Sequence, residues 1–584
     1  MSKKINYDNW SKDELVKEIK RIKETTYGLV WHRDLPEEKI DILINPDART
    51  PSEMFPNEMT GKPFPVLKEV KTKAIETDKN KPTNILIEGD NYHSLAVLNF
   101  THENTIDFIY IDPPYNTGSK SWKYNNDYVD KEDPFRHSKF ISFLYKRLKL
   151  SKNLLKESGV ICLTIDDHEI FPVGMLMDEI FGEENRLGVV TIVHNPRGRS
   201  DDKFFATSHE YALFYAKNAT QAKILKLDLN EEQIEAFNLE DDISKYRLLP
   251  LRRSGSNSLR TARRNLFYPI YYNPKTGEKL VNDPKNKSFI EILPIDTKGI
   301  ERVWRWGEET LSKTIDSEIV IRESKGKYIV LAKDRIKSGR RLKTYWVDPK
   351  YDASSHGTIL LESILGKNKA FDYPKSIFAL LDTLKIVVGD NKDATVLDFF
   401  AGSGTTGHAL LKLNKEDDGS RRFILCTNNE NNICTDVCYP RITKVIEGYK
   451  STNGEKVDAL GSNLRYFTAY DFIEAKETDR NKRKLVNQST EMLCIKESAF
   501  ELVQESDDFK IFRNHDKYLG IIFHEDSISD YKKVIKKING HFNTYTFSMT
   551  DDPHKEEFAD VADKVTLCAI PDVILKVYRE IFKE

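Results

Sequence analysis

Cysteines and long apolar runs are both scarce in this chain. Its 584 residues include only 6 cysteines, too few and too scattered for the disulfide framework of a small secreted domain. No stretch approaches the roughly 20 consecutive apolar residues that a membrane helix needs, and the first residues lack the apolar core of a secretory signal. The sequence therefore predicts a cytoplasmic protein with no membrane partner.

An overall excess of one charge is also missing, since 90 Lys and Arg face 92 Asp and Glu and leave a net charge of −2. The average hides one basic block. Residues 241–350 contain 25 Lys and Arg against 14 Asp and Glu, a balance of +11, so the rest of the chain carries −13. This asymmetry favours a module that binds a polyanion, although runs of charge are more often solvated surface.

The order of the predicted elements indicates one α/β domain interrupted by an insert, in a chain too long for a single hydrophobic core. Apolar runs predict buried strands at 84–88, 106–111, 159–165, 209–215, 395–400 and 422–427. Helical patterns lie between them at 92–99, 138–156, 168–181 and 405–413. Strands that alternate with helices predict a parallel sheet covered on both faces.

Shorter pieces are predicted outside this core. A capping-box pattern opens a helix at about 12–24, and residues 45–82 indicate an irregular connector. The polar stretch 474–484 is typical of an exposed helix or linker. A smaller α/β unit follows it and ends in a helix that begins near Pro571.

A glycine-rich turn, Gly402-Ser403-Gly404-Thr405-Thr406-Gly407, follows one strand and opens a helix. Such a turn lets the backbone approach a nucleotide-like cofactor, and it also occurs as a plain tight turn. Asp398 ends the preceding strand, where its carboxylate could meet an ammonium group. Glu430 ends the next strand, near the spacing at which a carboxylate holds ribose hydroxyls. Either carboxylate could instead be a solvated strand end.

The segment Asp112-Pro113-Pro114-Tyr115 lies at the carboxyl end of a predicted strand. Two prolines stiffen the loop, which then presents the Asp112 carboxylate beside the Pro113 carbonyl. An amino group that donates to both acceptors has its lone pair freed for attack on an electrophile, and Tyr115 offers a flat face for stacking. The alternative is a proline turn with a tyrosine in the core.

With these two motifs in this order, the chain resembles the β-class amino-methyltransferases that act on DNA, and among them the modification subunits of type III restriction-modification systems. The resemblance runs from about residue 84 to the C-terminus. The acceptor motif at 112–118 precedes the glycine turn at 398–406, which is the permuted order of this class. One departure is Phe399, where relatives usually have proline.

The resemblance implies a Rossmann-like, S-adenosylmethionine-dependent methyltransferase sheet with an inserted target recognition domain and a smaller α/β C-terminal domain. The expected segments are an N-terminal arm and connector at 1–80, the catalytic half at 81–215, the target recognition domain at 216–350, the cofactor half at 351–470 and the assembly domain at 471–584.

The resemblance also implies a role for each matching residue. Asp112 and Pro113 would hold the target amino group, Pro114 would stiffen their loop, and Tyr115 would stack on a base flipped out of the duplex. The expected cofactor residues are Asp398, Phe400, Gly402, Ser403, Gly404 and Thr405 at the methionine part, Glu430 at the ribose, Asp90 at the adenine, and Phe371 and Lys375 over the methionine end.

The implied reaction is transfer of a methyl group from S-adenosylmethionine to adenine N6 in double-stranded DNA. The implied assembly is a homodimer, with a helicase-nuclease restriction subunit as a further partner. Cytosine-N4, RNA and protein-glutamine transferases remain alternatives, as do an oxidoreductase that uses the glycine turn and a catalytically silent DNA-binding subunit.

In the basic insert, the candidate DNA contacts are Arg263, Arg264, Arg305, Arg340 and Arg341. Trp304 and Trp306 could stack on bases, although core packing explains such aromatics about as often. Cys426, Cys434 and Cys438 lie close in sequence but lack matching partners, so no metal is predicted.

Overall fold

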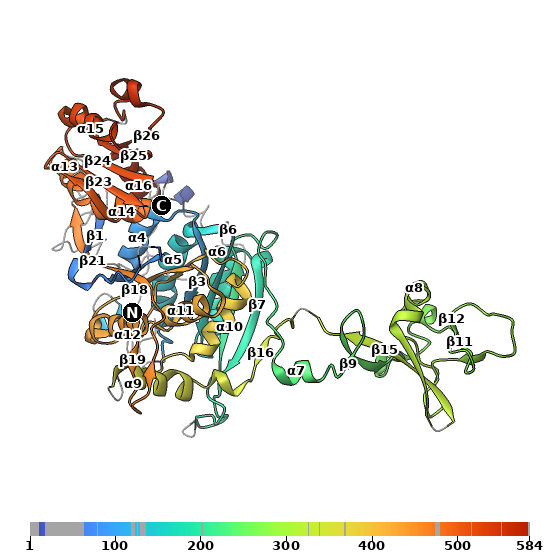
Figure 1. The fold of residues 1–584 in the computed structure, drawn as a ribbon. Coiled ribbons are helices and arrows are strands. Elements are labelled where there is room, and N and C mark those ends of the chain that lie inside the picture. Colours follow the sequence, from blue (N-terminus) through green and yellow to red (C-terminus); the bar gives the residue numbers. More distant parts are fainter. Residues whose placement is uncertain are drawn as a thin grey trace. The chain divides into compact units, whose positions relative to one another are not determined.

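The computed structural model describes residues 11–13, 15–17, 64–78, 80–117, 123–124, 127–128, 136–199, 202–324, 326–337, 339–366, 370–473, 479–514, 517–550 and 552–581. The chain divides into two compact units (Figure 1). The second unit is Lys226–Leu342, and the first comprises the segments on either side of it. The second unit therefore lies inside the expected insert, 216–350, and is narrower than it.

A ten-stranded sheet is the centre of the first unit. Its strands lie in the order β1 (Phe64–Glu69), β21 (Asn463–Ile473), β2 (Thr83–Glu88), β18 (Arg422–Thr427), β17 (Thr395–Asp398), β3 (Ile106–Ile111), β6 (Leu155–Ile165), β8 (His209–Ala216), β7 (Arg186–Val193) and β16 (Tyr345–Trp346). Neighbours from β21 to β6 are parallel. β8 is antiparallel to both β6 and β7, and β1 is antiparallel to β21.

Helices form two layers on this sheet. One layer contains α4 (Asn91–Thr101), α5 (Arg136–Leu154) and α6 (Ile170–Phe181), and the other contains α9 (Ile359–Leu365), α10 (Ile377–Val388), α11 (Thr405–Asp417) and α12 (Tyr439–Glu447). The connection from β3 through α5 leads to β6 on one side of the sheet centre, and the connection from β17 through α11 leads to β18 on the other side. Right-handed crossovers therefore place α5 and α11 on opposite faces. The predicted parallel sheet with both faces covered is confirmed for the strands from β21 to β6. The strand predicted at 209–215 is β8, which is antiparallel to both of its neighbours and corrects that part of the prediction.

The strands of the sheet centre form because their sequences are almost continuously apolar. In β3 every residue except Asp107 is buried, and all four residues of β17 are buried. Such runs are typical of strands that have helices on both faces. Each run ends in a polar residue, Asp112 after β3 and Asp398 in β17, so the apolar strands deliver carboxylates to the sheet edge.

The C-terminal segment forms a second, five-stranded sheet. Its strands in order are β22 (Glu501–Glu505), β23 (Phe509–Asn514), β24 (Lys517–Ile522), β25 (His541–Phe547) and β26 (Val565–Ile570). Its helices are α13 (Asp479–Gln488), α14 (Thr490–Glu497), α15 (Ile528–Ile535) and α16 (Asp572–Ile581). Because Leu519, Tyr545 and Ile574 belong to the same buried cluster as Leu95 of α4, this α/β segment shares its core with the large sheet.

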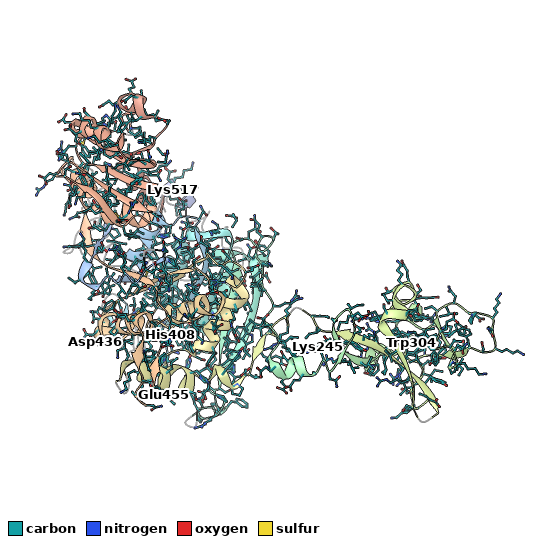
Figure 2. The ribbon with its side chains drawn as sticks, viewed as in Figure 1. Lys245, Trp304, His408, Asp436, Glu455 and Lys517 are labelled. Carbon is teal, nitrogen blue, oxygen red and sulfur yellow. The ribbon has the colours of Figure 1, made fainter. Side chains whose placement is uncertain are left out.

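The second unit is mainly antiparallel. One sheet has the order β14 (Ile319–Ser324), β15 (Lys327–Arg335), β10 (Lys245–Pro250) and β9 (Leu239–Glu240), and another has β12 (Lys279–Leu280), β11 (Ile270–Tyr272) and β13 (Ile290–Ile292). Two helices, α7 (Glu231–Glu235) and α8 (Glu308–Glu318), accompany them. Trp304 lies in the core of this unit, 2% exposed (Figure 2).

Several expectations fall partly on undescribed residues. Of the predicted helix at 12–24, residues 12, 13 and 15–17 are described, and all are helical. Of the connector predicted at 45–82, residues 45–63 lie outside the described residues, as do Gly118 and residues 474–478. Phe64–Glu69 of that connector forms β1, which corrects the prediction of an irregular segment. Among the helices that the structure describes, none combines the length and the apolar character needed to cross a bilayer.

Candidate active site

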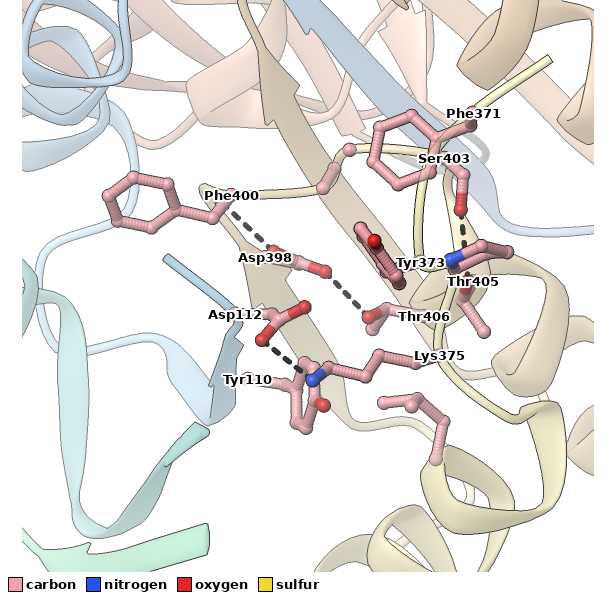
Figure 3. Close-up of a pocket in the computed structure, with 14 residues that line it drawn as sticks. Tyr110, Asp112, Phe371, Tyr373, Lys375, Asp398, Phe400, Ser403, Thr405 and Thr406 are labelled. Atoms are coloured by element: carbon pink, nitrogen blue, oxygen red, sulfur yellow. Dashed lines mark hydrogen bonds and ion pairs between the residues drawn. The ribbon is translucent and has the colours of Figure 1, made fainter. Parts of the chain in front are cut away.

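The strand order of the large sheet reverses between β17 and β3, and their carboxyl ends lie side by side, with Val396 paired to Phe108. A crevice at such a reversal is the usual ligand site of an open parallel sheet. One cavity opens at this place (Figure 3), and its lining includes Tyr110, Asp112, Phe371, Tyr373, Pro374, Lys375, Leu380, Asp398, Phe400, Ala401, Gly402, Ser403, Thr405 and Thr406. The acceptor loop and the glycine turn therefore share one cavity.

Two residues outside the acceptor loop hold the Asp112 side chain. Thr164 Oγ1, from β6, donates to Asp112 Oδ1 at 2.7 Å, and Lys375 Nζ lies 3.0 Å from the same oxygen (Figure 3). Burial, together with the nearby Glu210 carboxylate, raises the pKa of Asp112 above its usual value against the opposing effect of Lys375. The side chain of Asp112 is still 26% exposed, so the carboxylate remains accessible to a ligand.

A buried ionic cluster lies behind Asp112. Glu210, on β8, is only 4% exposed at its side chain, accepts from Tyr115 Oη at 2.9 Å and pairs with Lys375. The Lys375 ammonium also contacts Tyr115 Oη and lies 4.7 Å from the centre of that ring. Burial alone would raise the pKa of Glu210, but Lys375 and His194 outweigh it and lower that pKa. The cluster therefore fixes Tyr115 beside Asp112.

Asp398, from the neighbouring strand β17, also lines the cavity. Its Oδ1 accepts from the backbone N of Phe400 at 3.0 Å, and its Oδ2 accepts from Thr406 Oγ1 at 2.6 Å. Burial, and to a smaller extent the charge of Asp112, raises the pKa of Asp398 to about 7. A cation that entered the cavity would favour the ionised carboxylate.

The glycine turn requires glycine for conformation and for space. Gly402 and Gly404 have φ values of 48° and 76°. A Cβ atom on Gly402 would lie 3.1 Å from the ring of Phe371. Arg441, which is fully buried on α12, donates to Ser403 Oγ at 3.1 Å and to Thr405 Oγ1 at 2.8 Å. The glycines thus leave space on the cavity side of the turn, and Arg441 holds the turn in place by hydrogen bonds.

Asp90 and Glu430 follow the neighbouring strands β2 and β18, whose ends meet where Gly89 N donates to Thr427 O at 3.0 Å. Neither residue is among those that line the cavity described above. Asp90 caps α4 by accepting from Tyr92 N at 2.7 Å, and it pairs with Arg147 at 3.2 Å. Burial would raise the pKa of Asp90, but Arg147 and His93 lower it overall. Both carboxylates share the sheet edge with Asp398.

Three contributors to the site were not predicted from sequence: Thr164, Glu210 and Arg441. Glu210 lies in the predicted strand 209–215, and Thr164 lies in the predicted strand 159–165. The sequence around Arg441 contains no motif. Lys375 was expected over the cofactor, whereas its ammonium group binds the carboxylates of the acceptor side.

The candidate DNA contacts lie in the second unit. Arg263, Arg264 and Arg341 are exposed. Arg305 is also exposed, but its Nε donates to Pro250 O at 2.9 Å. Arg340 is half-buried and pairs through its backbone with Leu227.

The two tryptophans of this unit have structural contacts. Trp304 donates from Nε1 to Tyr268 O at 2.8 Å, and Trp306 O accepts from Tyr268 Oη at 2.9 Å. Trp304 is therefore a core residue and cannot stack on a base, which corrects that possibility.

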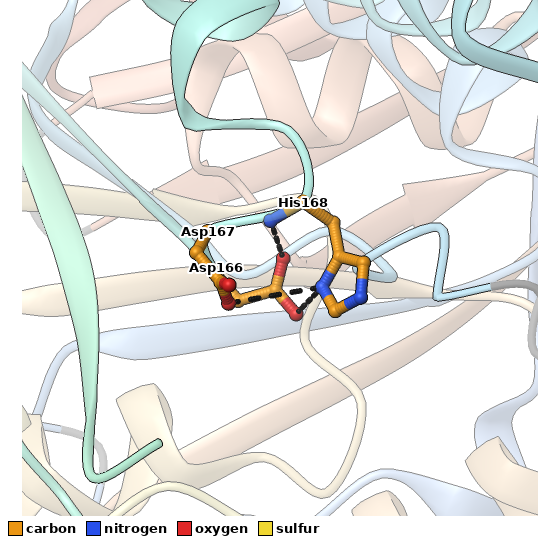
Figure 4. Close-up of side chains that lie close together, drawn as sticks. All are labelled: Asp166, Asp167 and His168. Atoms are coloured by element: carbon orange, nitrogen blue, oxygen red, sulfur yellow. Dashed lines mark hydrogen bonds and ion pairs between the residues drawn. The ribbon is translucent and has the colours of Figure 1, made fainter. Parts of the chain in front are cut away.

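One group of side chains within the described residues has the spacing of a metal site: Asp166, Asp167 and His168 (Figure 4). Asp166 accepts from the backbone N of His168 at 3.0 Å and lies 2.9 Å from its Nδ1, and this hydrogen bond raises the pKa of His168. These mutual contacts account for the closeness of the group.

Burial raises the pKa of Cys434 to about 11, so this thiol is protonated at neutral pH.

The fold and the cavity together define an enzyme of the Rossmann-like methyltransferase class. Residues 106–436, more than half of the chain, match the family described as DNA methylase, and the chain belongs to this family. The resemblance predicted from the two motifs is confirmed.

Named relatives agree with this family. The type II methyltransferase M.KpnI of Klebsiella pneumoniae is 37% identical over 382 residues, which cover 65% of this chain and 86% of that protein. The type III EcoPI Mod subunit of Escherichia phage P1 is 33% identical, and the match spans 63% of this chain and 61% of that subunit. The StyLTI Mod subunit of Salmonella typhimurium is 30% identical, over 74% of this chain and 68% of that subunit.

Among solved structures, the M1.HpyAVI–SAM complex aligns with 61% of this chain and 98% of its own, at 14% identity and a TM-score of 0.29. The cytosine-N4-specific PvuII DNA methyltransferase aligns with 66% of this chain and 98% of its own, at 12% identity and a TM-score of 0.32.

Proposed function

We propose that this chain transfers the methyl group of S-adenosylmethionine to the N6 amino group of adenine in double-stranded DNA. The observation that carries the proposal is the single cavity lined by both Asp112 and Asp398. A methyl transferase must bring a donor and an acceptor into line, and positioning of this kind supplies a large part of the rate enhancement. Asp112 is proposed to hold the acceptor and Asp398 the donor within this one cavity.

The residues of the glycine turn fit the methionine part of S-adenosylmethionine. A Cβ atom on Gly402 would lie 3.1 Å from the ring of Phe371, so glycine leaves room at this position. Asp398 has a buried carboxylate in the same cavity. Each oxygen of Asp398 already accepts one hydrogen bond and can accept another, so an ammonium group could pair with this carboxylate. When bound, the cofactor supplies an electrophilic methyl group on its sulfur. Glu430 and Asp90, on the same sheet edge, are proposed for the ribose and the adenine.

The acceptor side fits an exocyclic amino group. Asp112 Oδ1 already accepts from Thr164 and faces the Lys375 ammonium, so its geometry suits nitrogen donors. An N–H of the target base that donates to Asp112 would leave the nitrogen lone pair free for the methyl carbon. The methyl–sulfur bond would break as the methyl–nitrogen bond forms. The methylated nitrogen would then lose its surplus proton to Asp112 or to water, so no strong general base is required. Tyr115, fixed by Glu210, is proposed to stack on the base once it has left the duplex.

Adenine is favoured because the motif begins with Asp112, whereas cytosine-N4 relatives usually have serine at this position. Membership of the DNA methylase family argues against an oxidoreductase and against a protein-glutamine transferase. Cytosine-N4 transfer remains the second candidate, because family membership covers DNA methylases without naming the base.

The proposal is tested by expressing the chain in a host that lacks its own DNA methylation and analysing the nucleosides of the host DNA by mass spectrometry. N6-methyladenine is expected in the strain with the wild-type chain and not in a strain with Asp112→Ala. Single-molecule sequencing of the same DNA then gives the recognition sequence. N4-methylcytosine would contradict the choice of base, and unmodified DNA would contradict the activity.

Glu210→Gln tests the cluster that positions the acceptor loop. The substitution keeps the shape of the side chain but removes the charge that pairs with Lys375. The ammonium is then expected to bind Asp112 more tightly and to compete with the target amino group. Loss of one partner of a buried ion pair typically costs several kcal/mol, so we expect kcat to fall roughly 10- to 100-fold.

The measurement is steady-state methyl transfer to a duplex that contains the site, together with the Kd of S-adenosylhomocysteine, which should be unchanged. The control is His209→Ala on the same strand, because the His209 side chain forms its hydrogen bond with Tyr211 and not with the cluster. Wild-type kcat in Glu210→Gln would show that the cluster does not position the reacting groups.

Cofactor affinity is expected to depend on pH through Asp398. Its pKa of about 7 lies above the usual value for aspartate, so the free protein holds this carboxyl mostly neutral below pH 7. An ammonium group prefers the ionised form, and binding below pH 7 must therefore release a proton. Affinity should be constant above about pH 8 and fall up to tenfold per pH unit below 7. Calorimetric titration with S-adenosylhomocysteine between pH 5.5 and 8.5 measures this, and an affinity that does not change over that range would contradict it.

The names of the Mod relatives support a further proposal about assembly. We infer that the chain acts in the cytoplasm as the modification subunit of a type III restriction-modification system, as a homodimer and beside a restriction subunit. The exposed Arg263, Arg264 and Arg341, with Arg305 and Arg340, are proposed to contact DNA phosphates or bases. Light scattering tests the dimer, since one chain has a mass of 67.6 kDa.

A further inference from the structure

The loop between β7 and β8, residues 194–208, lies beside the acceptor site. Because β8 is antiparallel to both its neighbours, β7 runs in the same direction as β6 and β3. The loop therefore leaves the same sheet edge as Asp112. At its base, His194 Nδ1 lies 3.9 Å from Glu210 Oε2, the carboxylate that holds Tyr115. The base of this loop therefore lies close to the acceptor cluster.

The described part of the loop has a defined conformation. Its two sides are joined by backbone hydrogen bonds from Asn195 N to Ser208 O and from Arg199 N to Thr207 O, both 3.1 Å. Asp202 Oδ2 accepts from Thr207 N at 2.7 Å. These hydrogen bonds join the two described sides of the loop to each other.

The outer residues are two consecutive phenylalanines that are almost fully in solvent. Phe204 is 83% exposed and Phe205 is 90% exposed. Leaving two such side chains in water forgoes about 1.5–3 kcal/mol of burial each, so the arrangement indicates a surface that is covered in another state. Trp304 of the insert, by contrast, is buried in its own core.

Basic side chains lie on the same loop as these rings, together with the acidic Asp202, which accepts from Thr207 N. Arg197, Arg199 and Lys203 are exposed, and Lys203 Nζ lies 5.2 Å from the centre of the Phe204 ring. Apolar side chains flanked by basic ones fit a nucleic acid, in which phosphates border a stack of flat apolar bases. Proteins that deform a duplex commonly insert phenylalanine or leucine between base steps in this way.

We propose that Phe204 and Phe205 form a wedge that enters the base stack of duplex DNA next to the target adenine and occupies the space that the adenine leaves. Arg197, Arg199 and Lys203 hold the phosphates on either side. The proposal rests on the proposed function, because it assumes that the target base leaves the duplex to reach Asp112. It adds which residues of this chain stabilise the opened duplex.

The test uses the duplex found by sequencing and compares two forms of it. In one form the target adenine is paired with thymine, and in the other it faces an abasic site, where the cost of flipping is small. The double variant Phe204→Ala with Phe205→Ala should lose on the order of 10- to 100-fold in kcat/KM on the paired duplex. On the abasic duplex it should approach the wild-type rate. Phe204→Leu with Phe205→Leu keeps an apolar wedge and should retain most activity on both.

The control is Val503→Ala, which removes an exposed apolar side chain on β22 of the C-terminal sheet and should change nothing. Equal rates for the double alanine variant and the wild type on the paired duplex would overturn the wedge, as would an equal loss on both duplexes. Unchanged DNA kinetics with lost binding to phosphatidylserine vesicles would assign the two rings to a lipid surface instead. Failure of the wild type to methylate either duplex would overturn the proposed function, and the wedge with it.

Discussion

Asp112→Ala is expected to reduce methyl transfer on the order of 10³-fold and to leave the Kd of S-adenosylhomocysteine within a few-fold of wild type. Asp112 is the carboxylate proposed to hold the acceptor, and Thr164 and Lys375 hold its Oδ1. Removal of one well-placed hydrogen-bonding group from a reacting centre typically costs two to three orders of magnitude in rate. The glycine turn and Asp398 are unchanged, so cofactor binding should persist.

The assay is single-turnover transfer of a labelled methyl group to the site-containing duplex, with Kd measured by calorimetry on the same preparation. Asp167→Ala is a matched control, because its carboxylate follows the neighbouring strand β6 but is 60% exposed and outside the cavity lining. Transfer by Asp112→Ala within tenfold of wild type would show that this carboxylate does not activate the amino group.

Asp398→Asn is expected to show the opposite pattern, with cofactor affinity about 10- to 100-fold weaker and with transfer partly restored at high cofactor concentration. Asparagine keeps the size of the side chain: its oxygen can accept from Phe400 N, and its NH2 group can donate to Thr406 Oγ1, whose hydroxyl then accepts. It removes the charge that would pair with an ammonium group, and hydrogen bonds to charged groups are typically worth about 1.5–3 kcal/mol. The decline in affinity below pH 7 should also disappear.

Calorimetry with S-adenosylhomocysteine at pH 6 and pH 8 measures both effects, and a melting curve verifies that the variant is folded. Asp393→Asn, at an exposed carboxylate just before β17, is the control. An Asp398→Asn protein that binds with wild-type affinity would remove the ammonium contact from the proposal. Together, the two variants distinguish the contribution of Asp112 to methyl transfer from the contribution of Asp398 to cofactor binding.

The central sheet could be predicted from sequence because its strands are local apolar runs with helical patterns between them, as in β3 and β17. The edge strands could not. β16 has two residues, and β1 joins the sheet only by pairing with β21, which lies some 400 residues later. The shared core of the C-terminal segment also depends on contacts between α16 and α4, which no local pattern encodes.

The candidate site shows the same division. Asp112 and Asp398 could be predicted because each belongs to a contiguous motif at a strand end. Glu210 could not, since its role depends on contact with Tyr115, 95 residues earlier in the chain, and with Lys375. Arg441 reaches the glycine turn only because α12 packs against α11. Motifs predicted the reacting groups, and the fold supplies the residues that position them.

The most direct test of the central claim is a crystal structure with sinefungin, an analogue that has an amine in place of the transferable methyl group. The account predicts that its amino-acid end contacts Asp398 and the glycine turn. It also predicts that the replacing amine points at Asp112, within about 3 Å of the carboxylate. A ligand bound elsewhere, or one whose amine points away from Asp112, would contradict a shared cavity for donor and acceptor.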